Sequence, residues 1–102
     1  MEILFDQIVV GAEFVSAGRT ITEADIVSFA GLSGDFNPLH IDEKWVLENT
    51  SFRSRIAHGL LVQSIGEGLA CPELGQWKIV AFLEVQRKMI APVYPGARIE
   101  QH

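Results

Sequence analysis

The sequence is poor in residues that mark several classes of protein. Its single cysteine, Cys71, excludes a disulfide framework and a zinc site built from paired cysteines, so we expect Cys71 to be a small buried hydrophobe. Only 8 lysine and arginine residues stand against 13 aspartate and glutamate residues. The resulting net charge of −5 argues against a nucleic-acid partner, whose binding surface requires clustered basic residues.

Long apolar runs and linkers are also missing. No run approaches the length needed to cross a membrane, and residues 1–6 lack the basic segment and long apolar stretch of a secretion signal. There is no internal repeat, low-complexity tract or polar linker. With 102 residues, 48% hydrophobic and 21% charged, we predict a single domain over residues 1–102, cytoplasmic and without a membrane partner.

The stretch richest in chemistry is residues 33–42, SGDFNPLHID. The dipeptide Asn37-Pro38 starts turns and keeps the preceding residue out of helical geometry, so we predict an irregular loop. Such a loop lets Asp35 and His40 converge on one small volume. A carboxylate and an imidazole that share one substrate atom are the minimum equipment for acid–base catalysis near neutral pH. The alternative is a plain turn whose polar side chains cap local backbone groups.

Before this loop the sequence predicts strands and then a helix. Residues 3–10 are apolar and β-branched, and residues 11–16 continue the pattern, which indicates one strand or two short ones. Thr22 and Asp25 stand three residues apart, as in a capping box, and apolar residues then repeat at helical spacing up to Gly31. This helix leads into the loop.

Two further helices are predicted after the loop. Asp42 is a good cap for a short helix that runs to about Glu48 and ends at residues 49–51. Apolar residues at helical spacing predict a buried central helix over residues 59–70, ended by Pro72 and Gly75. Its apolar face is made of Leu61, Val62, Ile65 and Leu69. The two glycines inside it, Gly66 and Gly68, suggest close packing against a sheet.

The last part of the chain is predicted to be mostly extended. Residues 78–90 alternate between apolar and polar side chains, which is typical of a half-buried strand. Pro95-Gly96 then predicts a turn, and residues 97–100 begin another extended segment.

The pattern G-D-x-N-P-x-H-x-D, which runs from Gly34 to Asp42, resembles the signature of the MaoC-like, or hydratase-2, dehydratases of the hotdog superfamily. The likeness extends to residues 22–26, 29–33, 56–61 and 91–96, and so covers nearly the whole chain. The resemblance implies an α+β hotdog fold, in which an antiparallel sheet wraps around a central helix. By the same resemblance, family members continue with further long strands that this sequence does not contain, and we expect their absence to leave an open sheet edge.

The resemblance also implies roles for individual residues. Asp35 and His40 would activate water for the hydration of a trans-2-enoyl thioester, or for the reverse dehydration of a 3-hydroxyacyl thioester. Asn37 would orient this pair. The backbone N–H of Gly59, at the start of the central helix, would stabilise negative charge on the thioester oxygen. These four residues are the predicted catalytic set.

A second set is predicted to bind substrate. It consists of Ser33, Gly34, Pro38, Arg53, Arg55, His58 and Leu60. The two arginines are candidates for a phosphate of coenzyme A or of the pantetheine arm of a carrier protein, with plain surface solvation as the alternative. His58 also has a structural interpretation, as a side chain bonded to backbone at the start of a helix, and Asp42 is better explained as a helix cap than as an acid.

No metal and no separate cofactor is expected. Asp35, His40 and Asp42 are ligand types, but nothing else in the sequence supports a metal site. The expected partners are an acyl-CoA or an acyl carrier protein thioester, together with a second copy of the chain in a homodimer. Two other functions stay open: a non-catalytic hotdog module that binds an acyl thioester or a protein, and a thioester hydrolase, which the motif disfavours.

Overall fold

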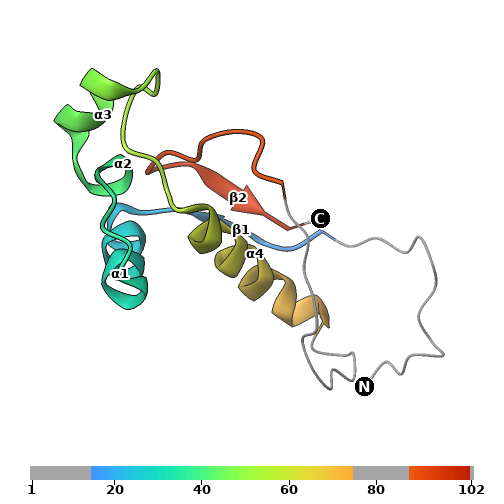
Figure 1. Ribbon diagram of the computed structural model, residues 1–102. Coiled ribbons are helices and arrows are strands. Elements are labelled where there is room, and N and C mark those ends of the chain that lie inside the picture. The colour runs from blue at the N-terminus through green and yellow to red at the C-terminus, as the bar shows by residue number, and fades with distance from the viewer. Residues whose placement is uncertain (1–14, 75–87, 102) are drawn as a thin grey trace.

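The computed structural model describes residues 15–74 and 88–101. Four helices and two short strands follow one another in these segments (Figure 1). In chain order they are β1 (Gly18–Thr20), α1 (Glu23–Ser33), α2 (Pro38–Ile41), α3 (Glu43–Asn49), α4 (Gly59–Leu74) and β2 (Arg98–Glu100).

The two strands join the beginning of the described chain to its end. β1 and β2 are antiparallel, with Arg19 opposite Ile99. Ser16 extends the pairing, because its backbone N–H donates to the carbonyl of Gln101 at 2.8 Å while its hydroxyl accepts the Gln101 N–H at 2.7 Å. Figure 1 shows this ribbon alongside α4, so the first and last described residues both lie close to the longest helix.

The predicted start of α1 is confirmed. The Thr22 hydroxyl accepts the N–H of Asp25, and the Asp25 carboxylate accepts the N–H of Thr22, which together form a capping box. The helix runs two residues beyond the predicted end at Gly31 and stops at Gly34, whose φ of 79° is left-handed. Glycine takes this conformation without the strain that a Cβ would cause. Gly34 thus turns the chain sharply into the site.

The stretch predicted to be irregular contains a helical turn. α2 occupies Pro38–Ile41, and the side chain of Asn37 caps it by accepting the N–H of Leu39 at 3.0 Å. Proline at the first helical position has its φ already set for a helix, which is why Asn37-Pro38 starts one here instead of an open loop. α3 follows directly with Asp42 as its cap, and it ends at Asn49 with Thr50 as its C-cap, within the predicted range 49–51.

The central helix α4 is longer than predicted. It starts at Gly59 as expected but continues to Leu74, so Pro72 lies inside its last turn instead of ending it. A proline removes one backbone hydrogen bond and crowds the carbonyl four residues earlier, which can kink a helix without ending it, so α4 continues for two residues beyond Pro72. The Gln101 side chain lies against Gly66, whereas no described atom beyond its own part of α4 lies within 4 Å of a Cβ position at Gly68. Most of the strand expected to pack against these glycines lies outside the described residues.

The core of the described chain is small and apolar. Ile21, Ile26, Ala57 and Leu61 are buried and in contact. Partly buried hydrophobic side chains pack around them, namely Phe29, Val62, Ile65, Val93 and Ile99. Leu61, Val62 and Ile65 were all predicted to form the apolar face of the central helix, and this is confirmed. The core thereby fixes α1, α4 and the C-terminal segment relative to one another.

Two predicted elements lie mostly outside the described residues: the strand or strands over residues 3–16 and the strand over residues 78–90. The described end of the latter, Lys88–Ile90, is not in a strand. Here the side chain of Met89 lies against Gly59. The turn at Pro95-Gly96 and the extended segment after it are confirmed. No described helix is both long and apolar enough to cross a membrane.

The core makes a prediction about stability. Ile26 is 1% exposed, whereas the adjacent Val27 is 57% exposed. We expect Ile26→Ala to lower the free energy of unfolding by about 2 to 5 kcal/mol, because it removes buried methyl groups and leaves a cavity. Val27→Ala is the matched control and should change the free energy by less than about 1 kcal/mol. Urea denaturation followed by circular dichroism measures both, and equal effects would show that Ile26 is not in the core.

The capping box makes a prediction about pH. The pKa of Asp25 lies below its ordinary value of 3.8, chiefly because its carboxylate accepts the Thr22 N–H, and also because it pairs with Arg19 at 2.7 Å. A lowered carboxyl pKa stabilises the folded state fully above the ordinary value and loses this effect as the pH falls through the folded-state pKa. The difference in melting temperature between wild type and Asp25→Asn should therefore shrink between pH 6 and pH 3. A constant difference would contradict this assignment.

Candidate active site

The Asp35 side chain is held by the loop between α1 and α2. The backbone N–H of Asp35 donates to the Ser33 hydroxyl at 3.1 Å, and its Oδ1 accepts the backbone N–H of Asn37 at 3.2 Å. Ser33 is itself anchored, because its hydroxyl donates to the carbonyl of Phe29. The carboxylate keeps about half of its surface exposed, with Oδ2 directed toward His40. Local hydrogen bonds thus fix Asp35 without removing it from solvent.

His40 projects from α2 and is largely buried. Its Nδ1 lies 2.8 Å from the carbonyl oxygen of Ile56, an atom that can only accept a hydrogen bond, so Nδ1 carries the proton of the neutral ring. Nε2 is then the unprotonated nitrogen, and it lies 3.9 Å from Oδ2 of Asp35. That distance is too long for a direct hydrogen bond. A small molecule such as water can bond to both groups at once.

His58 completes the cluster immediately before α4. Its ring stacks on that of His40, with centroids 3.8 Å apart and planes at 24°, and its other neighbour is the ring of Phe29, 4.9 Å away. Its Nε2 lies 3.0 Å from the backbone carbonyl oxygen of Asp35. The predicted structural role of His58, a side chain bonded to backbone at a helix start, is confirmed. The stack on His40 could not be predicted, because the two histidines are 18 positions apart and no sequence pattern links them.

These groups open onto a cavity of about 320 Å³ at the start of α4. Its lining consists of Phe29, Ser33, Asp35, His40, His58, Gly59 and Leu60. The first backbone N–H groups of a helix have no partner within the helix and lie at the positive end of its dipole. The cavity therefore combines a carboxylate, an imidazole and a helix N-terminus suited to a negatively charged oxygen.

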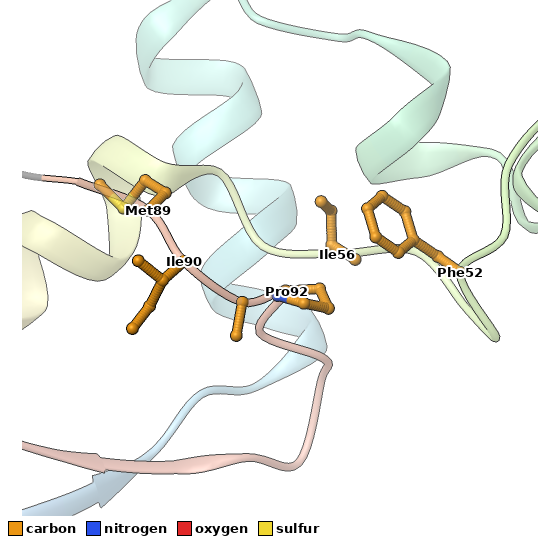
Figure 2. A pocket seen from close by; sticks show the side chains of 6 residues that line it. Phe52, Ile56, Met89, Ile90 and Pro92 are labelled. Carbon is orange, nitrogen blue, oxygen red and sulfur yellow. The ribbon is translucent and has the colours of Figure 1, made fainter.

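Two apolar cavities continue from this one. The nearer, of about 220 Å³, is lined by His40 and Gly59 as well as by apolar residues such as Val62 and Met89. The farther, of about 310 Å³, is shown in Figure 2. Its lining, Phe52, Ile56, Met89, Ile90, Ala91 and Pro92, comes from the segment between α3 and α4 and from the segment that leads to β2. The nearer cavity shares His40 and Gly59 with the one around Asp35, and it shares Ile56, Met89, Ala91 and Pro92 with the farther one. Apolar space therefore lies next to the acid–base pair.

The structure brings most of the predicted site together, with some exceptions. Asn37 and Asp42 are occupied as the caps of α2 and α3. Gly34 caps the end of α1 and Pro38 opens α2, but neither lines the cavity next to Asp35. The two arginines do not line it either, and each already has partners. Arg55 pairs with Glu23 and Glu43, and the guanidinium of Arg53 lies 4.0 Å above the ring of Tyr94.

One group of potential metal ligands occurs in the described residues. Asp35, His40 and His58 each offer a ligand atom within 4.8 Å of the others, a different set from the one considered in the sequence. The nitrogen lone pairs of an imidazole lie in its ring plane. Because the two rings are stacked nearly parallel, their lone pairs do not converge on one ion. The geometry suits the sharing of protons better than metal binding.

Comparison with known protein families gives a clear match. Residues 7–102 match the model of the MaoC like domain. Protein MaoC of Klebsiella aerogenes is 36% identical over 97 residues, which make up 94% of this chain and 28% of that protein. The (R)-specific enoyl-CoA hydratase of Aeromonas caviae is 36% identical over 77 residues, or 74% of this chain and 55% of that enzyme. The chain thus spans about half or less of these relatives.

Solved structures agree. A monoamine oxidase regulatory protein from Archaeoglobus superposes with a TM-score of 0.87 at 35% identity, over 97% of this chain and 67% of that one. The (R)-hydratase of A. caviae involved in PHA biosynthesis superposes with a TM-score of 0.72 at 29% identity, over 90% of this chain and 70% of that one. The predicted α+β hotdog fold is confirmed by these likenesses. On the match over residues 7–102, the chain belongs to the MaoC-like dehydratase domain family.

Proposed function

We propose that this chain hydrates a trans-2-enoyl thioester, or dehydrates the corresponding 3-hydroxyacyl thioester in the reverse direction. One observation carries the proposal. Oδ2 of Asp35 lies 3.9 Å from Nε2 of His40, and both residues line a cavity that is also lined by Gly59 at the start of α4. Relatives named as (R)-specific enoyl-CoA hydratase and 3-hydroxybutyryl-CoA dehydratase support the choice of this reaction.

In the hydration direction, a water molecule lies between the carboxylate of Asp35 and Nε2 of His40. The carboxylate orients the water, and Nε2 accepts one of its protons while the oxygen bonds to C3 of the enoyl group. The imidazolium then returns that proton to C2. The oxygen adds to C3 and the proton to C2 from the same side of the double bond, so the addition is syn. The reactants need little movement, because the water is already held between Asp35 and His40.

Bond formation at C3 moves negative charge onto the thioester oxygen. The backbone N–H of Gly59, in the first turn of α4, is the donor that would stabilise this charge. The helix dipole acts in the same direction. A thioester whose oxygen bonds to Gly59 has its C2 and C3 near His40, since both residues line the same two cavities.

The two apolar cavities next to this one can accommodate the acyl chain of the substrate. The cavity next to His40 and Gly59 is lined mostly by apolar side chains and adjoins the one around Phe52 and Ile56 (Figure 2). An acyl chain attached to the reacting thioester gains free energy by burial there. The substrate is therefore an acyl thioester of coenzyme A or of a carrier protein. The coenzyme A or pantetheine group is part of this substrate, and the proposed reaction uses no separate cofactor.

The acid–base pair is tested by substitution. We expect Asp35→Asn and His40→Ala each to lower kcat for a trans-2-enoyl-CoA by at least about a hundredfold, the size expected for loss of a positioned acid or base. Loss of the conjugated thioester absorbance measures the rate. Asp42→Asn is the control for Asp35→Asn, because Asp42 caps α3 and asparagine also caps helices.

The outcome that contradicts the proposal is a near-normal rate in either folded variant. Absence of turnover by the wild type with acyl chains of several lengths, on coenzyme A and on a carrier protein, would instead favour a non-catalytic module that binds acyl thioesters.

Assembly is a further expectation from the same proposal. Large apolar side chains near the site are exposed in the single chain, among them Leu32 at 85% and Phe36 at 55%. A second copy that covers such side chains would remove them from water. We expect light scattering at micromolar concentration to give twice the chain mass of 11.3 kDa. A mass of one chain across a concentration series would show that the subunit acts alone.

A further inference from the structure

We propose that His58 is a positioning residue, which holds Asp35 and His40 in register with each other. This inference rests on the function proposed above. The His58 side chain touches both members of the acid–base pair, through a hydrogen bond to the backbone of Asp35 and a ring stack on His40. It also directly precedes Gly59, the first residue of α4. It thus connects three parts of the site.

The contact with Asp35 fixes the loop. A backbone carbonyl accepts hydrogen bonds and cannot donate, so the 3.0 Å contact requires a proton on His58 Nε2. The bonded carbonyl belongs to Asp35 itself, whose side chain reaches toward His40. Loss of this donor leaves the loop held only from its own side, by the hydroxyl of Ser33 and the cap at Asn37.

The contact with His40 fixes the imidazole. The His58 ring covers one face of the His40 ring at 3.8 Å, while Phe29 packs against His58 at 4.9 Å. His40 is therefore confined on its face by His58 and at its edge by the bond from Nδ1 to the carbonyl of Ile56. Rotation of His40 would break that bond and turn Nε2 away from Asp35.

His58 is unsuited to a direct chemical role. It is 3% exposed, and its buried Nδ1 has no hydrogen-bond partner among residues 15–74 and 88–101. A protonated ring would bury an unsatisfied N–H at this nitrogen, which is costly, so the ring is neutral with its one proton committed to the Asp35 carbonyl. Such a ring has no free proton to give to the substrate. His58 therefore contributes by fixing the positions of Asp35 and His40.

Two variants separate the two contacts. Glutamine at position 58 keeps an N–H donor near the position of Nε2 but loses the ring, whereas phenylalanine keeps a ring but loses the donor. We expect His58→Gln and His58→Phe each to lower kcat by about tenfold to a hundredfold, because a small displacement of reacting groups costs that much. KM should change by less than about threefold, since His58 offers little surface to the substrate.

A double-mutant cycle distinguishes positioning from mere stability. If His58 acts through His40, then His58→Phe should cost little further kcat in a His40→Ala background. The same loss in both backgrounds, measured on folded protein, would overturn the proposal. So would a kcat within twofold of wild type in both His58→Gln and His58→Phe.

A measurement without turnover keeps this inference distinct from the proposed function. Long-range ¹H–¹⁵N spectra of the His40 ring in the wild type should show a single neutral tautomer with the proton on Nδ1. His58→Gln and His58→Phe should show averaging of the two tautomers. An unchanged, locked His40 ring in both variants would refute the role of His58, even if no enoyl thioester is turned over by the wild type.

Discussion

The site depends on two hydrogen bonds made by one residue, Ile56. Its carbonyl accepts a hydrogen bond from Nδ1 of His40 at 2.8 Å, and its N–H donates to the carbonyl of Leu39 at 3.2 Å. The next residue, Ala57, donates its N–H to the carbonyl of Val93 at 2.7 Å. The short segment before α4 is therefore tied on one side to α2 and on the other to the C-terminal segment. Because the bond to Nδ1 also decides the tautomer of His40, the same contact that joins the elements leaves Nε2 free for chemistry.

The remaining structure supports this arrangement from outside. The core of Ile21, Ile26, Ala57 and Leu61 holds α1 against α4, and Arg55 pairs with Glu23 of α1 and Glu43 of α3. Exposed ion pairs contribute little free energy, so the apolar contacts provide most of the stabilisation, while Arg55 restricts how the helices are oriented. The arginine that was expected to bind phosphate thus has a structural position between two helices.

In the loop between α1 and α2, Asp35 is fixed by hydrogen bonds while its carboxylate stays accessible to substrate. Asp35 is held by the hydrogen bond that its N–H donates to the Ser33 hydroxyl and by the one that its carboxylate accepts from the Asn37 N–H, and the left-handed Gly34 sets the direction of the chain. The Asp35 carboxylate nevertheless keeps half of its surface open and stays 3.9 Å from His40. A shorter, direct bond between the two would satisfy both groups and leave no place for water. The gap is what makes the pair suitable for the proposed addition of water.

The local features of the fold could be predicted from the residues alone. Thr22 and Asp25 indicated the capping box, Asp42 the cap of α3, Gly59 the start of α4, and the motif from Gly34 to Asp42 the family and the pair Asp35 and His40. These depend on neighbours within a few positions, where residue type and spacing carry the information. Three contacts became visible only in the folded chain: the stack of His58 on His40, the pairing of Arg55 with Glu23 and Glu43, and the bond to Ile56 that sets the tautomer of His40. Each of these joins residues from 12 to 32 positions apart, through contacts that form only when the core brings α1, α2, α3 and α4 together, and no local pattern encodes which side chains will then meet.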